Sequence, residues 1–513
     1  MAKVRPQPFE SIAPHASNRL LNVGQVKQGN TLTSSLDASI QRMATKALRD
    51  QLSELANQGA SDGAVVVLNN ATGEVLAYVG SGGRFSKASQ VDAAASPRQA
   101  GSTLKPFLYA LAFDQQLLSP ASLLEDSELQ LSTDAGLYTP SNYNEQFTGP
   151  VSVRHALASS LNIPAVRTIT LTSVEAFYET LQKLQLSTLH PQAQHYGYSL
   201  ALGSADLTLL DLTNAYRSLA NGGRYTSVSW TPLYLRGTSK NVSTQVFSPQ
   251  SSWLIANILS DNSARFETFG FDSVLATPFW SAVKTGTSKD MRDNWCLGFT
   301  EKFTVGVWVG NAGGSPMRNV SGVSGAAPVW AEVMRSLHQQ LPSREPLPPS
   351  GLIAKNIRFE EEIEPARREW FLRSMAPSAP TLADGSISPP MPIIALSHNA
   401  GQIRIVYPSN GSLIAIDPDI PNHIQGYVPR HSWSSSSIQQ LDVKSESNLR
   451  WQLNGIELAP NLRKVDLVAG KHTLTLLSEE GKVLDQSHFE IRGKLKSSQL
   501  NDLPLVNNGG PSF

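Results

Sequence analysis

Apolar positions in the first part of the chain predict a helix followed by a β-hairpin. Between Ser35 and Asn57 apolar residues recur at steps of three and four, the period of an amphipathic helix, and Asp37 is placed to act in its first turn. Residues 63–80 then show two apolar runs separated by the turn Asn69–Gly73, which predicts a hairpin. Residues 1–30 are polar and show no sustained period, so we expect a connector there.

Helical periods dominate the middle of the chain, from about Lys105 to Gly222, and return between Ser252 and Leu259. Strand patterns follow at residues 281–284, 294–299 and 303–310. Because strands at both ends enclose a helical middle, one sheet must be built from distant parts of the chain. This arrangement predicts an α+β or α/β sandwich.

Proline-rich stretches at residues 341–349 and 388–392 divide the second half of the chain. After them, short alternating segments separated by Gly, Asn and Pro predict a small all-β sandwich. Its expected strands cover residues 402–407, 412–416, 449–453, 472–477 and 482–491. The expected organisation is a connector (1–30), a first domain (31–340), a proline-rich linker (341–390), a β-sandwich domain (391–497) and a flexible tail (498–513).

Composition narrows the possible partners. Hydrophobic residues make up 40% and charged residues 16% of the chain, and 42 Lys+Arg balance 42 Asp+Glu, which disfavours disorder and a nucleic-acid partner. The lone cysteine, Cys296, lies in an apolar run where we expect it to be buried, and it rules out an intramolecular disulfide. The sequence shows no apolar run of membrane-spanning length. We therefore expect either a cytoplasmic protein or one whose export and membrane segment precedes this sequence.

Three short motifs carry the strongest chemical signal: Ser102 to Lys105, Ser160 to Asn162, and Lys284 to Ser288. A serine hydroxyl is a poor nucleophile unless a base takes its proton, and a lysine three residues later on a helix lies on the same face. That lysine must be neutral, and burial together with a second cation such as Lys284 would lower its pKa. Gly101 allows close backbone approach at a helix start, where free N–H groups favour a developing oxyanion.

Partial copies of these motifs occur elsewhere, so order and spacing decide between them. Ser281 and Lys284 also form a Ser-x-x-Lys pair, but on a strand their side chains would point to opposite faces. Ser260 to Asn262 repeats the Ser-x-Asn pattern, where the end of a helix explains it. The triple that begins at Ser102 is therefore the candidate site.

The triple and its surroundings resemble the transpeptidase domain of the class A penicillin-binding proteins. The resemblance covers about residues 31–340 and is carried by the motifs and by residues 98–107, 156–166 and 202–223. Residues 416–421, 451–455 and 470–472 resemble the C-terminal β-domain of the penicillin-binding protein 1C subfamily. Together, the two resemblances imply an α+β fold of the penicillin-binding transpeptidase and serine β-lactamase type, which is an antiparallel sheet with flanking helices. A small all-β sandwich is expected to follow it. Residues 1–30 match neither the membrane anchor nor the glycosyltransferase domain of that family, so we expect no glycan polymerisation.

The resemblance also assigns a role to each residue of the motifs. It implies Ser102 as the acylated nucleophile, Lys105 as its base, and Ser160 with Lys284 as a proton relay to the leaving group. Asn162 would hold the substrate amide, and the segment Thr285, Gly286 and Thr287 would meet the substrate carboxylate. The backbone N–H groups of Ser102 and Thr287 would form the oxyanion hole. No metal or other cofactor is implied.

The function expected from the resemblance is a serine-type D-Ala-D-Ala transpeptidase that cross-links peptidoglycan stem peptides and is inhibited covalently by β-lactams. A D,D-carboxypeptidase or β-lactamase of the same fold is the first alternative, although no Glu-x-x-Leu-Asn segment lies between Asn162 and Lys284. A non-catalytic penicillin-binding scaffold is the second. The resemblance places the family in the periplasm at the cytoplasmic membrane, with cell-wall synthesis proteins as candidate partners of the C-terminal domain. The motifs all precede Gly310, so a chain ending near residue 345 is expected to keep the site.

Several conspicuous residues are expected to be structural. We expect His155 on a helix surface or in the core, and Asp293 and Asn294 in a turn. The tryptophans are expected in the core, and these are Trp295, Trp308, Trp330 and, in the β-domain, Trp451.

Overall fold

Two compact units make up the chain, Met1–Ser127 with Ser141–Ile394 and Glu128–Pro140 with Ala395–Phe513, and we call them the larger and the smaller unit. The computed structural model describes residues 11–22, 31–133, 136–143, 145–236, 242–269, 273–359, 363–376, 404–408, 413–415, 429–432, 449–459, 465 and 468–492.

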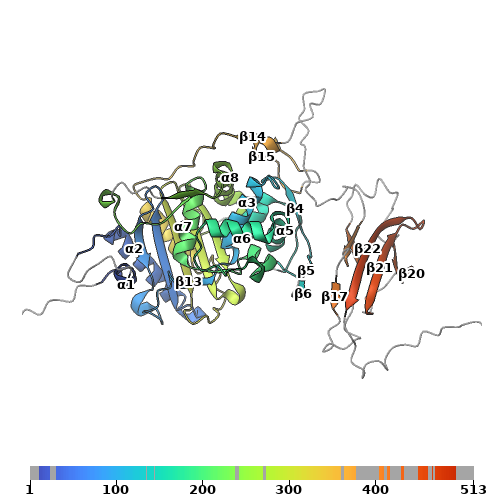
Figure 1. The fold of residues 1–513 in the computed structure, drawn as a ribbon, viewed down its shortest axis with the longest axis horizontal. Coiled ribbons are helices and arrows are strands. Elements are labelled where there is room, and N and C mark those ends of the chain that lie inside the picture. The colour runs from blue at the N-terminus through green and yellow to red at the C-terminus, as the bar shows by residue number, and fades with distance from the viewer. Residues whose placement is uncertain are drawn as a thin grey trace, which may run out of the picture. The chain divides into compact units, whose positions relative to one another are not determined.

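A five-stranded antiparallel sheet forms the centre of the larger unit (Figure 1). Its strand order is β11-β12-β13-β1-β2, and the bounds are β1 Asp62–Asn69, β2 Val75–Val79, β11 Ala282–Thr287, β12 Asp293–Phe299 and β13 Phe303–Gly310. Asp62 of β1 pairs with Gly310 of β13, so strands from distant parts of the chain are neighbours inside the sheet. The prediction of one sheet built from distant segments is confirmed.

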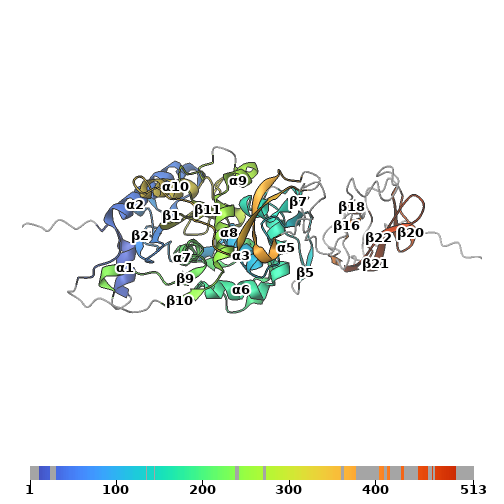
Figure 2. The same ribbon diagram turned by 90° about the horizontal axis from the view of Figure 1, so that it is seen from above.

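Helices cover both faces of this sheet (Figure 2). On one face, α2 (Ala38–Glu54) and α10 (Ala327–Leu337) share an apolar cluster with the strands. On the other face, α7 (Leu209–Ala220) contacts β1 and β13. Because each strand is buried on both sides, the strands read as continuous apolar runs, as in Ala64 to Leu68. The larger unit therefore has the expected α+β architecture.

The remaining helices and strands of the larger unit surround this sandwich. The helices are α1 Pro14–Asn22, α3 Lys105–Asp114, α4 Val153–Ala158, α5 Asn162–Thr172, α6 Val174–Lys183, α8 Pro249–Ser260 and α9 Asn262–Phe269. The two-stranded sheets are β3 Arg98–Gln99 with β8 Asp206–Leu207, β4 Leu123–Asp126 with β7 Gly149–Ser152, β9 Arg224–Thr226 with β10 Ser243–Gln245, and β14 Leu352–Ile357 with β15 Arg367–Leu372.

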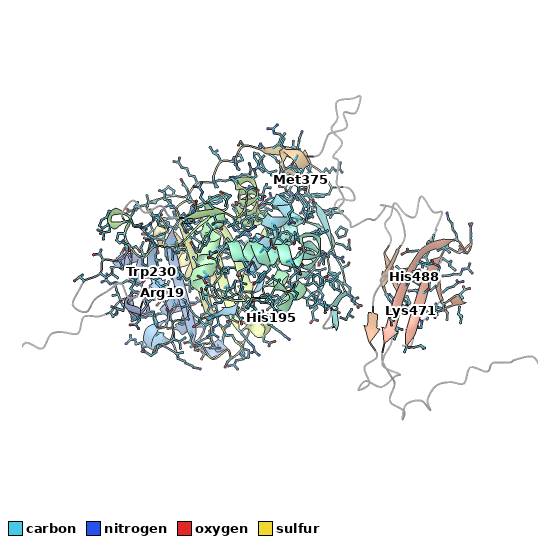
Figure 3. The ribbon with its side chains drawn as sticks, viewed as in Figure 1. Arg19, His195, Trp230, Met375, Lys471 and His488 are labelled. Carbon is cyan, nitrogen blue, oxygen red and sulfur yellow. The ribbon has the colours of Figure 1, made fainter. Side chains whose placement is uncertain are left out.

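Local sequence signals located several of these elements. Asp37 caps α2 by accepting from the N–H groups of Ser39 and Ile40, at 2.8 and 3.0 Å. Other segments differ from the prediction. The expected connector contains α1, whose Arg19 lies over the ring of Trp230 (Figure 3). Because this contact joins residues that are far apart in the sequence, the pattern of the first thirty residues gave no sign of the helix.

The smaller unit is a β-structure with its own core. Its five-stranded sheet has the order β17-β22-β21-β19-β20, and a two-stranded sheet pairs β16 with β18. The bounds are β16 Arg404–Tyr407, β17 Leu413–Ala415, β18 Arg430–Ser432, β19 Arg450–Leu453, β20 Ile456–Glu457, β21 Gly470–Leu477 and β22 Val483–Arg492, and contacts assign β5 Leu131–Thr133 and β6 Gly136–Tyr138 to the same unit. Ile405 of β16 packs with Leu474 and Phe489 of the larger sheet. The five strands predicted here are all present, and β18 and β20 were not foreseen.

Among the described residues, no helix combines the length and the apolar character that crossing a bilayer requires. The expected flexible tail at 498–513 lies outside the described residues.

The stretch expected to be a proline-rich linker contains a hairpin that packs on the larger unit. Phe371 of β15 and Ile357 of β14 share an apolar cluster with Leu123 of β4. Trp253 of α8 donates from Nε1 to the carbonyl of Pro346 at 2.8 Å. Proline content predicted an extended spacer, but alternating apolar residues in residues 352–372 supply a buried face. The limits of the domains themselves stay a prediction.

A buried ion pair ties this hairpin to α4. Glu369 is fully buried and accepts two hydrogen bonds from Arg154, at 2.8 and 2.6 Å. Burial alone would raise the pKa of Glu369, but Arg154 and Arg367 together outweigh burial and lower it. Next to this pair, Glu364 accepts from the backbone N–H and the hydroxyl of Ser152, the N-cap of α4. The start of α4 is therefore held by two carboxylates from residues 364–369.

Removing one partner of this pair should destabilise the larger unit strongly. Glu369→Ala leaves the guanidinium of Arg154 buried with one remaining acidic partner, Asp261, so we expect a loss of about 3–5 kcal/mol in the free energy of unfolding. Urea unfolding followed by tryptophan fluorescence measures it. As a control, Asp50→Ala removes a partner of the exposed pair with Lys46 and should cost far less.

A chain ending near residue 345 would lose Glu364 and Glu369 together. We therefore expect its free energy of unfolding to be lower than that of the full chain, although it keeps all three motifs. A loss in Glu369→Ala no larger than in Asp50→Ala would contradict the role assigned to the buried pair.

Candidate active site

Ser102 lies in a short 3-10 segment that continues directly into an α-helix. The 3-10 segment η3 (Gly101–Leu104) carries Ser102, and α3 begins at Lys105. Ser102 is partly exposed, whereas its neighbours in η3 are buried. Tyr216 of α7 donates to the carbonyl of Thr103 at 2.7 Å, and this bond ties η3 to α7. The i and i+3 spacing puts Ser102 and Lys105 on one face of the same turn.

The amine of Lys105 is fully buried and bound to the second motif. Its Nζ donates to the carbonyl of Ser160 at 2.6 Å, to that of Leu161 at 3.0 Å and to Oδ1 of Asn162 at 2.7 Å. Burial and, after it, the charge of Lys284 hold the pKa of Lys105 well below its usual value, while Asp126 acts in the opposite direction. Loss of one proton leaves two N–H groups for three acceptors and frees a lone pair on the nitrogen.

The second motif turns sharply between α4 and α5. Ser160 has φ +62°, which is the left-handed region and is uncommon for a residue with a side chain. This conformation turns the carbonyls of Ser160 and Leu161 toward Lys105. Conformations of this kind cost of order 1–3 kcal/mol and persist where the surroundings hold them, as the anchored α4 does here.

The third motif lies on β11 and completes the cluster. Lys284 is buried and donates from Nζ to the hydroxyl of Ser160 at 2.7 Å and to the carbonyl of Thr285 at 2.8 Å. Burial lowers the pKa of Lys284 to about 7, and the nearby Arg265 acts in the same direction. The hydroxyl of Thr287 accepts from the backbone N–H of Gly322 at 3.0 Å. Hydrogen bonds therefore connect Lys105, Asn162, Ser160 and Lys284 through one short loop.

Close backbone contact around the first motif depends on three glycines. A Cβ on Gly286 would lie 2.6 Å from Cγ2 of Thr103, so only glycine lets β11 approach η3 this closely. Gly203 has φ +77°, and its Cβ would lie 1.8 Å from the carbonyl oxygen of Gly101. A Cβ on Gly101 would in turn lie 3.3 Å from the nitrogen of Thr287. The backbone of Gly101, the residue before Ser102, therefore lies next to that of Thr287.

Asp293 and Asn294 correct the prediction of a turn, because both are buried and begin strand β12. Asp293 accepts from the hydroxyl of Ser288 at 2.9 Å and from Nε1 of Trp308 at 3.1 Å, which fixes the end of β11. Asp and Asn are common in turns, and nothing local in the sequence distinguishes them from residues that hold a strand end.

Other expectations for single residues are confirmed. Cys296 is buried, and so are Trp295, Trp308 and Trp330. Trp451 packs against the core of the smaller unit. Ser260 ends α8, as a helix stop should. His155 lies on α4 and lines a cavity of about 1000 Å³ whose lining contains no residue of the three motifs.

Sequence comparison agrees with this geometry. Residues 63–335, just over half of the chain, match the model of the penicillin binding protein transpeptidase domain. Penicillin-binding protein 1C of Escherichia coli is 31% identical over 64% of this chain and 40% of its own length. Penicillin-binding protein 1B of Vibrio cholerae is 29% identical over 69% of this chain and 46% of its own length. The chain thus spans less than half the length of these curated relatives.

Solved structures share the fold. Penicillin-binding protein 1A from Haemophilus influenzae matches with a TM-score of 0.61 at 18% identity, over 72% of this chain and 77% of its own. The PonA1 protein from Mycobacterium tuberculosis, solved in complex with penicillin V, matches with a TM-score of 0.54 at 21% identity, over 66% of this chain and 94% of its own. Taken with the match over residues 63–335, these likenesses lead to one conclusion: the chain belongs to the penicillin-binding protein transpeptidase family.

Proposed function

We propose that this chain is a D,D-transpeptidase that cross-links peptidoglycan stem peptides through an acyl-serine intermediate on Ser102. The observation that carries the proposal is the hydrogen-bonded cluster of Lys105, Asn162, Ser160 and Lys284 beside that serine. Both buried lysines of the cluster have lowered pKa values, which favours proton transfer at a lower pH than an exposed lysine would allow.

In the proposed acylation, Ser102 Oγ attacks the carbonyl carbon of the penultimate D-alanine and its proton passes to neutral Lys105. The backbone N–H groups of Ser102 and Thr287 would stabilise the oxyanion, and the close approach of Gly101 to Thr287 supports this assignment. As the peptide C–N bond breaks, the leaving D-alanine amine takes a proton that Ser160 relays from Lys284. An amine from a second stem peptide then attacks the ester carbonyl and gives up a proton to Lys284 through Ser160. The ester C–O bond breaks as the new amide forms, and Ser102 leaves with the proton that Lys105 returns.

The remaining motif residues would position the substrate. Asn162 would hold the substrate amide, and the hydroxyls of Thr285 and Thr287, on either side of Gly286, would meet its terminal carboxylate. Their position on a paired strand favours a fixed geometry. Because β-lactams carry a similar carboxylate and a reactive amide, we propose that they acylate Ser102 covalently. No step needs a cofactor.

We further propose that the chain acts in the periplasm at the cytoplasmic membrane, where stem peptides are present. Cell-wall synthesis proteins are the partners we propose for the smaller unit, whose β-structure carries none of the three motifs.

Labelling with a fluorescent penicillin tests the nucleophile. The full chain should be labelled, and Ser102→Ala should abolish labelling without a change in the unfolding transition. Ser281→Ala is the matched control, because Ser281 is also followed three residues later by a lysine but bonds Thr277 instead. Labelling that persists in Ser102→Ala, or that Ser281→Ala removes, would sink the assignment.

Product analysis separates transpeptidation from the two alternatives. With a stem pentapeptide and an excess of an acceptor amine, the proposal predicts an amide-linked product and release of one D-alanine per turnover. Hydrolysed peptide as the main product at saturating acceptor would make the chain a carboxypeptidase. No turnover in a chain that penicillin still labels would make it a binding scaffold.

The two lysines should act as one unit. Lys105→Ala and Lys284→Ala should each slow acylation by at least about 10²-fold, the usual loss for a general base. The fold-loss in acylation rate of the double variant should be much smaller than the product of the two single fold-losses, because both lysines serve the same proton path. Lys302→Ala changes an exposed lysine in the β12–β13 turn and should acylate normally. Multiplying effects would mean that the lysines act independently.

A further inference from the structure

A fully buried carboxylate lies behind the second motif, and the family motifs do not include it. Asp126 ends β4 and accepts four hydrogen bonds. Nδ2 of Asn142 donates to both of its oxygens, at 2.8 and 2.9 Å, and Thr148 donates from its backbone N–H at 2.9 Å and its hydroxyl at 2.8 Å. None of these donors is a cation. A carboxylate that is buried this deeply needs all of these bonds to offset its lost hydration.

Asp126 fixes the side-chain amide of Asn142, and this amide in turn binds the start of α5. Because carboxylate oxygens only accept, the NH₂ group of Asn142 must face Asp126, and its Oδ1 must face the other way. That Oδ1 accepts from the backbone N–H groups of Asn162 and Ile163, at 2.9 and 3.3 Å. Leu161, the N-cap residue, supplies no side-chain bond to the helix. Asn142 therefore caps α5 from twenty residues away.

The capped residue is also the one that binds the proposed base. Asn162 accepts from Nζ of Lys105 at 2.7 Å and donates from Nδ2 to the carbonyl of Ser141 at 2.9 Å. Ser141 directly precedes Asn142, so the same short segment holds both the backbone and the side chain of Asn162. A continuous path of hydrogen bonds thus runs from Asp126 through Asn142 and Asn162 to Lys105.

Charge adds a second link between the two ends of this path. Burial lowers the pKa of Lys105 most, Lys284 on β11 lowers it further, and Asp126 on β4 opposes both. The loop before α5 and Asn162 itself contribute neutral oxygens. Tyr109, one turn along α3, is uncharged because burial raises its pKa. When Lys105 takes a proton from Ser102, Asp126 is the negative charge near the new ammonium.

We propose that Asp126 is a positioning residue for acylation, which orients Asn162 through Asn142 and stabilises the positive charge that Lys105 gains from Ser102. This inference rests on the proposed function. It adds to the three motifs a carboxylate and an amide that act through them and touch no substrate.

The test is the pH dependence of acylation by a fluorescent penicillin, measured on the full chain. Asp126→Asn turns an acceptor into a donor that faces Asn142 and Thr148, and it removes the charge. The maximal acylation rate should fall by about 10-fold or more, as small misplacements of catalytic groups cause. The acidic limb of the rate profile should also move to lower pH, because Lys105 without the opposing charge has a lower pKa and is neutral at lower pH.

Two further variants separate this role from a loss of stability. Asn142→Ala breaks the path but keeps the carboxylate, so it should lower the maximal rate without moving the acidic limb to lower pH. Asp114→Asn is the matched control, because Asp114 accepts from the backbone N–H of Ser248 at the start of α8, away from the motifs. It should lower the unfolding temperature and leave both the rate and the limb unchanged.

Rates like those of the wild type in folded Asp126→Asn, or an equal loss at every pH, would overturn the proposal. If Asp126→Asn does not fold, Asn142→Ala decides: a lower maximal rate supports the path, and a normal rate refutes it. The wild type in the same experiment reports separately on the proposed function, because a chain that is never labelled at Ser102 would overturn both.

Discussion

The buried amine of Lys105 is the group on which the geometry of the site depends, because a lysine in a low-dielectric environment needs an acceptor for each of its protons. Those acceptors all come from residues 160–162, more than fifty residues further along the chain. The loop between α4 and α5 must therefore be in place before the lysine can be buried at all. Its left-handed Ser160 cannot be held by the loop alone and relies on what anchors the two flanking helices.

Buried and half-buried acids provide that anchoring on both sides. Glu369 and Glu364 hold the start of α4 through Arg154 and Ser152, and Asp126 holds the start of α5 through Asn142. The two α4 anchors come from a hairpin beyond residue 335, where the family match ends. The folded part of the chain that supports the candidate site thus extends beyond the segment that contains the motifs.

The central sheet provides the opposite wall of the site. Strand β11 carries Lys284 to Thr287 and is paired with β12 along its whole length, so these residues have little freedom relative to one another. Gly286 and Gly101 then allow η3 to approach that wall at backbone distance. Under the proposed mechanism, the oxyanion donors and the two lysines are therefore organised before any substrate arrives, which is the condition for electrostatic catalysis.

Local patterns in the sequence were sufficient for features that depend on neighbours in the chain. They located α2 with its Asp37 cap, the β1–β2 hairpin, the five predicted strands of the smaller unit and the three motifs. Period, turn residues and motif spacing are local, so they can be read without a fold. The distances between Lys105, Asn162 and Lys284 are not local.

Tertiary structure alone decided which polar residues support the site. Asp126, Asn142 and Glu369 look like ordinary turn or surface residues in the sequence, and Asp293 was assigned to a turn for the same reason. Each became a structural anchor because folding buried it opposite a partner at least fifteen residues away. Burial makes such a bond strong, but the burial of a single polar residue next to a distant partner is a property of the packed chain, and the neighbouring residues do not indicate it.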